Sequence, residues 1–363
     1  MRSVEDLPTP AVLVDLDVVE KNLTRMAERA RAAGVKLRPH AKTHKVPEIG
    51  RMQLALGAAG LSLAKVGEAE VFVHAGFDDI FLAYPTIGGD RARRLLALSD
   101  RAKIRVGADS LEGARSLSEV FAAARRRLAV VLKIDCGYHR VGVEPGRALE
   151  LARAIAELPG LELAGVFTHA GQAYSTETAQ GVADVGRLEG ETVAAVASEL
   201  RAAGLPVAEV SVGSTPTAFS SMKVKGVTEC RPGNYVYHDG SQVALGTCTS
   251  KDCAMTVAAT VVSVPAQDRA VVDAGSKTLS SDILRPRPGG HGLVLGTSSR
   301  IDRLSEEHGV VAVAPGDRFR VGQRVAILPN HACVVSNLHE RVYGVRAGSV
   351  ECEWRVAARG RVD

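Results

Sequence analysis

The chain has 363 residues, of which 46% are hydrophobic and 24% are charged, and its formal net charge is +4 at pH 7. This balance is typical of a folded globular protein with room for one large domain or two ordinary ones, and it excludes a disordered chain. The small, evenly spread charge argues against nucleic acid or an anionic membrane as a partner. Because the chain starts without an apolar signal sequence and no apolar run approaches the roughly 18 residues of a membrane span, we expect a cytoplasmic protein.

Residues 11–235 alternate short β-type runs with longer helical runs such as Val18–Ala33, for which Asp17 is a candidate N-cap and Gly34 a candidate C-cap. The β-type runs are Ala11–Leu16, Leu37–Lys42, Leu61–Val66, Asp79–Pro85, Lys103–Asp109, Ala129–Asp135, Leu161–His169 and Glu209–Ser214. Strands separated by helices pair in parallel. Eight such units predict an α/β fold with a closed (β/α)₈ barrel of the TIM type, and an open doubly wound sheet is the alternative.

The pattern changes after Tyr235, where helical runs almost vanish and short β-type runs alternate with Gly, Pro and Asp turns. These runs are Met255–Val264, Ala270–Asp273, Arg324–Leu328 and Arg341–Arg346. The sequence therefore predicts a barrel domain over residues 1–235 and a smaller, mainly β domain over residues 236–363. Residues 1–10 are candidates to join the second domain.

The six cysteines are expected to be free thiols, since disulfide frameworks belong to short secreted chains. Cys248 and Cys253 lack a second pair of ligands at the spacing of a structural zinc site. We interpret their spacing as structural.

The most unusual segment is Arg38–Lys45, at the end of the second β-type run. Strand ends form the active face of a barrel. A lysine held there in apolar surroundings has a lowered pKa and can form a Schiff base with an aldehyde, which makes Lys42 a candidate catalytic residue. The alternative is a basic turn that binds a phosphate or a helix.

Three further strand ends carry polar groups, in the segments Asp135–Arg140, Thr168–Tyr174 and Val212–Thr217. The last is a turn of small residues whose backbone N–H groups and hydroxyls suit a phosphate. The segment Arg231–Tyr235 offers further amides.

Near the other end of the chain stands Pro329–Cys333. On an extended segment, His331 and Cys333 point to the same side, and both are good ligands for an ion such as Zn²⁺. Two ligands leave positions open for water or substrate. The alternative is a half-buried histidine beside a buried thiol.

Taken together, these motifs resemble the pyridoxal-phosphate (PLP) enzymes of fold type III, the alanine-racemase-like barrels. The resemblance is greatest to the group of D-threonine aldolase and D-serine dehydratase, and it covers nearly the whole chain. The segments that carry it are Arg38–Lys45, Thr168–Tyr174, Arg231–Tyr235, Asp273–Lys277, Glu307–Gly309 and Pro329–Cys333.

The resemblance implies a role for each matching residue. Lys42 would hold PLP as a Schiff base, His169 would stack near its pyridine ring, and Arg140 would lie near its phenolic oxygen. Either Tyr174 or Arg231 would face the ring nitrogen. The phosphate would be bound by Gly213, Ser214, Thr215, Gly233 and Asn234.

His331 and Cys333 would bind a divalent metal (Zn, Mn or Mg) that grips the β-hydroxyl of the substrate. The typical D-threonine aldolase has His-x-Asp at this place, whereas His-x-Cys resembles D-serine dehydratase. The chain as a whole resembles the aldolase branch, so the first expectation is retro-aldol cleavage of 3-hydroxy-D-amino acids to glycine and an aldehyde. The alternative is β-elimination to a 2-oxo acid and ammonia. A racemase and a non-catalytic PLP carrier are less favoured.

Lys42 is the natural base at Cα in the elimination reading, and His40 or His308 is the candidate base for the aldolase reading. The resemblance also implies a homodimer that acts on a small D-amino acid.

Overall fold

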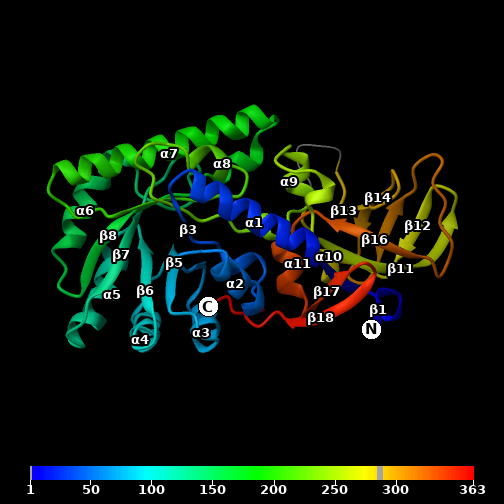
Figure 1. Cartoon of the computed structure of the whole chain (residues 1–363), viewed down its shortest axis with the longest axis horizontal. Coiled ribbons are helices and arrows are strands. Elements are labelled where there is room, and N and C mark those ends of the chain that lie inside the picture. The colour runs from blue at the N-terminus through cyan, green and yellow to red at the C-terminus, as the bar shows by residue number, and fades with distance from the viewer. Residues whose placement is uncertain (1, 284–288) are drawn as a thin grey trace. The chain divides into compact units, whose positions relative to one another are not determined.

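The computed structural model describes residues 2–283 and 289–363, which form two compact units (Figure 1). The barrel unit comprises Arg25–Lys42, Ile49–Gly233 and Arg361–Asp363. The β unit comprises the chain up to Thr24, Thr43–Glu48 and Asn234–Gly360. The chain thus passes from one unit to the other directly after Lys42.

The barrel unit contains an eight-stranded parallel sheet in the order β3-β10-β9-β8-β7-β6-β5-β4. Its strands are β3 (Lys36–Leu37), β4 (Leu61–Leu63), β5 (Asp79–Pro85), β6 (Lys103–Ala108), β7 (Leu128–Lys133), β8 (Leu161–Phe167), β9 (Glu209–Val212) and β10 (Glu229–Cys230). A parallel bridge between His40 and Ser62 joins the two edges, so the sheet curls back on itself. The predicted α/β barrel is confirmed.

Two strands differ from the sequence prediction. The first predicted barrel strand is β2 (Ala11–Asp15), which lies in the other unit between β11 and β17. The missing barrel strand is β10, only two residues long. An apolar run shows that a strand exists but not which sheet it joins, and β10, which holds Glu229, has no apolar run to reveal it.

Helices follow most of the barrel strands. They are α2 (Pro47–Ala55), α3 (Val66–His74), α4 (Gly89–Leu98), α5 (Leu111–Ala123), α6 (Ala148–Ala156), α7 (Ala179–Ala202) and the short α8 (Ala218–Ser221). In contrast, α1 (Leu16–Ala32) follows β2 and precedes β3. Apolar residues at helical spacing face the sheet, as Ala92, Leu95 and Leu98 do on α4. Side-chain caps start helices where the sequence provides them: Ser110 accepts a hydrogen bond from the N–H of Gly113 at the start of α5.

The β unit is built on a ten-stranded sheet in the order β1-β18-β17-β2-β11-β12-β15-β14-β13-β16. β11 also pairs with β16, which closes the strands from β11 to β16 into a barrel. The remaining strands are β1 (Arg2–Ser3), β11 (Met255–Ala266), β12 (Arg269–Val272), β13 (Gly292–Val294), β14 (Arg300–Leu304), β15 (Gly309–Ala312), β16 (Arg324–Pro329), β17 (Arg341–Arg346) and β18 (Ser349–Arg355). Three short helices complete it: α9 (Gly240–Ala244), α10 (Ser276–Leu279) and α11 (Ala332–Leu338).

All six cysteines are free thiols. Within residues 2–283 and 289–363, no helix combines the length and the apolar character needed to cross a membrane.

Candidate active site

Lys42 lies in a tight turn rather than at the tip of a strand. β3 ends at Leu37, and Ala41–Thr43 forms a 3-10 turn, so the predicted strand Leu37–Lys42 is wrong beyond its first residue. The backbone N–H of Lys42 donates to Nδ1 of His40 at 3.4 Å, and the N–H of His40 donates to the carbonyl of Pro232. Proline at position 39 and these local bonds favour a turn over a longer strand. The turn leaves Lys42 exposed between buried neighbours.

His169 follows β8 and is held as a neutral imidazole. Its Nδ1 donates to the carbonyl of Gly213, just after β9. Burial lowers the pKa of His169, and the positive charges of Lys42 and Lys133 lower it further. The ring of Tyr138 stands edge-on to it at a centroid distance of 6.1 Å. Lys42 and His169, predicted from separate strand ends, are therefore close enough to interact electrostatically.

The turn after β9 is fixed by a carboxylate that the sequence analysis did not single out. Glu189, buried on α7, accepts hydrogen bonds from the N–H groups of Gly213 (3.1 Å) and Ala170 (3.2 Å), and from the hydroxyl of Thr217 (2.7 Å). The N–H of Gly213 is thus already used, which differs from its expected part in a phosphate cradle. A charged residue on the buried face of a helix was the signal that could have revealed Glu189.

Ser214 fits the expected phosphate site. Its Oγ is buried and has no hydrogen-bond partner among the described residues. A buried hydroxyl without a partner is costly, and a bound phosphate would satisfy it. Thr215, the next residue, is buried as well.

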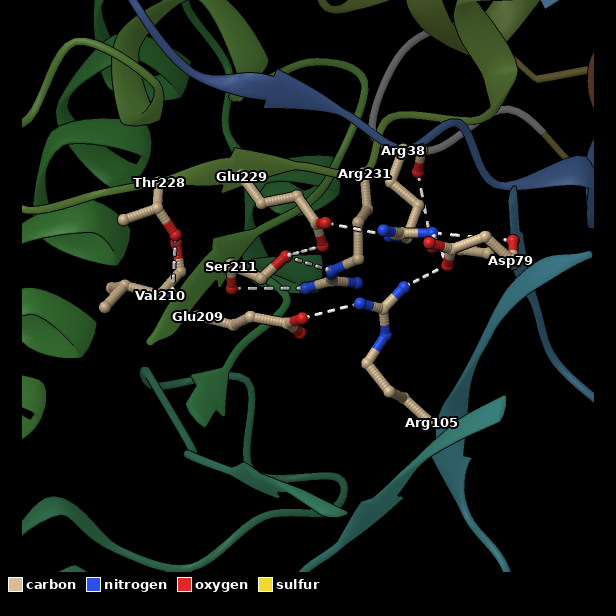
Figure 2. A network of polar contacts seen from close by, with 10 residues as sticks. Arg38, Asp79, Arg105, Glu209, Val210, Ser211, Thr228, Glu229 and Arg231 are labelled. Carbon is tan, nitrogen blue, oxygen red and sulfur yellow. Dashed lines mark hydrogen bonds and ion pairs between the residues drawn. The ribbon is translucent and has the colours of Figure 1, made fainter. Parts of the chain in front are cut away.

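Arg231 belongs to a buried ionic network inside the barrel (Figure 2). Its Nε donates to Oγ of Ser211 at 2.7 Å, and that hydroxyl donates to Glu229 at 2.8 Å. Glu229 in turn accepts from Nε of Arg38 at 2.8 Å. The network continues through Asp79, which accepts from both Arg38 and Arg105.

Glu209 completes the network by accepting from Arg105 at 2.6 Å. Three guanidinium groups therefore face three carboxylates. A buried ion pair is tolerated when its charges are matched and hydrogen-bonded in this way. Burial lowers the pKa of Arg231, but a guanidinium remains charged.

The two candidates for the ring nitrogen sit in different surroundings. Arg231 is 4% exposed, and its Nη2 donates to the carbonyl of Thr168 at 2.5 Å. Its Nη1 donates to none of the described residues. Tyr174 is 38% exposed in the 3-10 turn Gly171–Ser175. Arg231 therefore offers a donor inside the barrel.

Arg140 lies on an exposed loop after β7. Its guanidinium stands 4.7 Å above the ring of Tyr138. Asp135 shapes this loop by accepting from the N–H groups of Gly137, Tyr138 and His139. Arg140 is thus positioned next to the aromatic ring that contacts His169.

In the β unit, His331 and Cys333 meet, but not on an extended segment. β16 ends at Pro329, and helix α11 starts at Ala332 with His331 as its N-cap, so the prediction of a strand there is wrong. The cause is Asp239, whose carboxylate accepts from the N–H of Ala332 at 3.0 Å and thereby caps the helix. The side chains of His331 and Cys333 are in hydrogen-bond contact across the first turn.

Both residues of this pair have further partners. Nδ1 of His331 lies 2.6 Å from Oδ2 of Asp282, and Sγ of Cys333 lies 3.3 Å from Oγ1 of Thr43, the residue after Lys42. Burial lowers the pKa of His331, but the neighbouring charges of Cys333, Asp239 and Asp282 outweigh it and raise that pKa. A carboxylate on one ring nitrogen is the usual way to orient a metal-binding histidine through the other.

Imidazole and thiolate are a donor set that suits a divalent ion such as Zn²⁺. No cluster of three or more such side chains occurs in the described part of the chain. An ion held here would therefore take its other ligands from water or substrate.

Three further candidates remain, Asn234, His308 and His40. Asn234 donates from Nδ2 to Asp239 at 2.6 Å, next to the start of α11, and follows Gly233 in the chain. His308 is exposed in the turn between β14 and β15. His40 is 8% exposed beside Lys42.

Comparison with known families decides the assignment. Residues 14–240 match the family model "Alanine racemase, N-terminal domain", and residues 254–345 match "Putative serine dehydratase domain". The chain belongs to the alanine racemase-like family of PLP enzymes. The expected family is therefore confirmed.

Within this family, several relatives match almost end to end. A D-threo-3-hydroxyaspartate dehydratase from Delftia sp. (strain HT23) is 36% identical, over 90% of this chain and 91% of its own. A D-threonine aldolase from Arthrobacter sp. is 34% identical, over 97% and 93%. The crystal structure of D-threonine aldolase from Filomicrobium marinum superimposes with a TM-score of 0.91 at 34% identity, over 100% of this chain and 98% of its own.

Two variant structures of D-threo-3-hydroxyaspartate dehydratase also superimpose, each with a TM-score of 0.92. One carries a histidine-to-alanine substitution. The other carries a cysteine-to-alanine substitution two positions further along and is described as the metal-free form.

Proposed function

We propose that this chain is a PLP- and divalent-metal-dependent lyase that acts on 3-hydroxy-D-amino acids. Its relatives of similar length act, by their names, on D-threonine, D-serine or 3-hydroxy-D-aspartate, all of which carry a hydroxyl at Cβ. The observation that carries the proposal is the contact between His331 and Cys333 at the start of α11, which suits an ion that binds this hydroxyl.

In the barrel unit we assign the cofactor to the residues around Lys42. The Nζ of Lys42 binds the aldehyde, Ser214 and Thr215 bind the phosphate with Gly233 and Asn234, and His169 lies against the ring. PLP, when bound, withdraws electrons from the bonds at the substrate Cα. A Cβ at Gly213 would lie 3.1 Å from Arg231, so glycine lets the turn after β9 pass close to this side chain, and we assign Gly213 to the same turn as Ser214 and Thr215.

We assign the ring nitrogen to Arg231 rather than to Tyr174, because Nη1 of Arg231 is a donor without another acceptor among the described residues. A guanidinium donates a hydrogen bond but does not give up its proton. Arg231 would therefore donate a hydrogen bond to the ring nitrogen without protonating it, and would make PLP a weaker electron acceptor than a proton donor there would. Arg140 is assigned to the phenolic oxygen.

In the β unit, His331 and Cys333 hold the divalent ion. Asp282 keeps the imidazole oriented through Nδ1, which leaves Nε2 for the ion. A divalent ion there supplies a Lewis acid to the substrate hydroxyl and lowers its pKa.

Two reactions fit this arrangement. In retro-aldol cleavage, a base removes the hydroxyl proton and the Cα–Cβ bond breaks, giving glycine and an aldehyde; His40 and His308 are the candidate bases. In β-elimination, Lys42 accepts the Cα proton and the hydroxyl leaves as water, which gives an enamine. The imine form of this enamine takes up water and releases a 2-oxo acid and ammonia. Cys333 favours elimination, because the dehydratase among the relatives has a metal-free variant that lacks a cysteine two positions after a histidine.

Product analysis distinguishes the two reactions. The purified holoenzyme is incubated with D-threonine, D-serine and 3-hydroxy-D-aspartate in the presence of Zn²⁺ or Mn²⁺. A 2-oxo acid with ammonia supports elimination, and glycine with an aldehyde supports retro-aldol cleavage. Absence of both products with all three substrates, despite bound cofactor, would leave the non-catalytic carrier as the better reading.

We further propose that the active species is a cytoplasmic homodimer, as the family resemblance implies. Light scattering at assay concentration should give twice the mass of one chain. An active monomer would refute this part of the proposal.

A further inference from the structure

Two cysteines of the β unit flank a single 3-10 turn, outside the candidate active site. Cys248 precedes this turn, which spans Ser250–Asp252, and Cys253 follows it. The carboxylate of Asp252 accepts from the N–H and the hydroxyl of Thr249, at 3.0 and 2.9 Å. The turn is therefore tightly closed, and it folds Cys253 back towards Cys248.

The two thiols are hydrogen-bond partners. Sγ of Cys253 lies 3.7 Å from the carbonyl oxygen of Thr249, the residue next to Cys248, and the two thiols share a hydrogen bond. His238 is a second hydrogen-bond partner of Cys248. Cys248 is half-buried and reachable from solvent, whereas Cys253 is only 9% exposed.

These contacts divide the two sulfurs into different roles. Hydrogen bonds from Cys253 and from His238 lower the pKa of Cys248. The same contact and burial raise the pKa of Cys253. An accessible thiolate beside a protonated thiol is the arrangement of an attacking and a resolving cysteine.

We propose that Cys248 and Cys253 form a redox-active dithiol that hydrogen peroxide converts into a disulfide. The thiolate of Cys248 attacks one peroxide oxygen, so that an S–O bond forms, the O–O bond breaks, and one water leaves after protonation. The thiol of Cys253 then attacks the sulfenic sulfur and loses its proton. The S–S bond forms as the S–O bond breaks, and a second water leaves. The peroxide is reduced by two electrons, and a dithiol reductant reverses the change.

The other cysteines lack this combination. Cys136 and Cys230 are buried, and burial raises the pKa of each. Cys352 is half-buried, but burial raises its pKa too, and among the described residues no hydrogen bond joins it to a second thiol. Cys352 is therefore a matched control for accessibility.

The test uses the wild-type holoenzyme and one equivalent of hydrogen peroxide. Trypsin cleaves after Lys251, between the two cysteines, so only a disulfide holds the two resulting peptides together. We expect this linked pair under non-reducing conditions, with a mass about 2 Da below that of the separate thiol peptides, and its separation by dithiothreitol. Iodoacetamide at pH 7 should alkylate Cys248 at least about tenfold faster than Cys352.

Variants separate the two steps. Cys253→Ser should accumulate a sulfenic acid at Cys248 that dimedone traps, and Cys248→Ser should form no link. Cys352→Ser should form the link like the wild type. Failure to recover the linked peptides, or alkylation of Cys352 as fast as Cys248 in the wild type, would overturn the proposal. Since no readout is turnover, the result is independent of the proposed lyase activity.

Discussion

The barrel unit and the β unit hold their charged side chains in opposite ways. In the barrel, Arg38 and Glu229 have side chains only 3% and 2% exposed and belong to a network with matched charges (Figure 2). In the β unit, His331 and Asp282 form a pair whose side chains are 41% and 49% exposed. The position of His331 is set by the start of the short helix α11, of which it is the N-cap. A buried, matched network fixes geometry permanently, whereas a half-exposed pair leaves room for exchangeable ligands. The comparison assigns rigid positioning to the barrel and ligand exchange to the β unit.

The largest effect is expected from replacing Lys42, the proposed cofactor lysine of the barrel unit. Lys42→Ala should lower turnover by at least about 10²-fold, since both the anchor and the proposed base are lost. Borohydride should fix the cofactor mass on the peptide that contains Lys42 in the wild type and on no peptide in the variant. A fixed label on Lys45 or Lys277 would contradict the assignment.

The metal pair tests the β side. Chelation, or Cys333→Ala combined with His331→Ala, should lower turnover by about 10²-fold or more while the fold and the bound cofactor persist. Cys333→Asp should shift the preferred ion from Zn²⁺ towards Mn²⁺, because a carboxylate is a harder ligand. Metal analysis and steady-state rates measure both effects, and Cys352→Ala is the control. Full activity of the double variant after chelation would show that His331 and Cys333 have only a packing role and bind no metal needed for turnover.

Substitutions in the buried ionic network of the barrel should lower the stability of the fold. Glu229→Gln removes the more deeply buried of the two carboxylates that pair with Arg38, leaves only Asp79 as its charged partner, and should lower the free energy of unfolding by about 3 kcal/mol. Glu162→Gln, at an exposed position of β8 in the same sheet, should change it by less than about 0.5 kcal/mol. Urea denaturation of the two variants measures the difference. Equal values would mean that the network contributes no more than surface charges.

The barrel interior also predicts a pH dependence. Burial, and then the charge of Arg231, lower the pKa of Lys133 to about 7. The unfolded chain therefore binds more protons at this site than the folded one between about pH 7 and pH 10.5. Stability should thus rise with pH, by about 2 kcal/mol from pH 7 to pH 9. Lys133→Met should remove this increment in urea denaturation at the two pH values, and an unchanged increment would assign it to other groups.

The smallest effect is expected at Lys277. It pairs with Glu306 and Glu307 at 2.8 Å, but it is exposed. Exposed ion pairs contribute little to the free energy of unfolding, so Lys277→Ala should leave both the thermal midpoint and turnover unchanged. A clear loss of turnover would give the exposed surface of the β unit a part in catalysis.

Strong apolar periodicity made most of the barrel predictable from sequence. Runs such as Asp79–Pro85 and Leu161–Phe167 carry enough apolar residues to be recognised as strands. β10 does not, because its two residues include a charged one that belongs to the buried network. The hydrophobic pattern of the sequence does not reveal such a strand, because its position in the sheet is set by residues that are distant in the chain.

The candidate site shows the same limit. The proximity of His331 and Cys333 was foreseen, but from a strand that does not exist. The helix that brings them together is capped by Asp239, 93 positions earlier in the chain. In the same way, the preference for Arg231 over Tyr174 depends on burial and on partners such as Ser211, which no spacing in the sequence reveals.

Glu189 has a practical consequence for enzyme engineering. Its one carboxylate accepts hydrogen bonds from Ala170, Gly213 and Thr217, and it therefore links the loop after β8 to the loop after β9. Two of the three bonds come from backbone N–H groups and survive most side-chain substitutions in the loops, whereas replacement of Glu189 would remove all three at once. Substitutions intended to change the substrate range are better made at the exposed Tyr138 and in the loop around it. Glu189 should be kept, because it fixes the positions of the two loops.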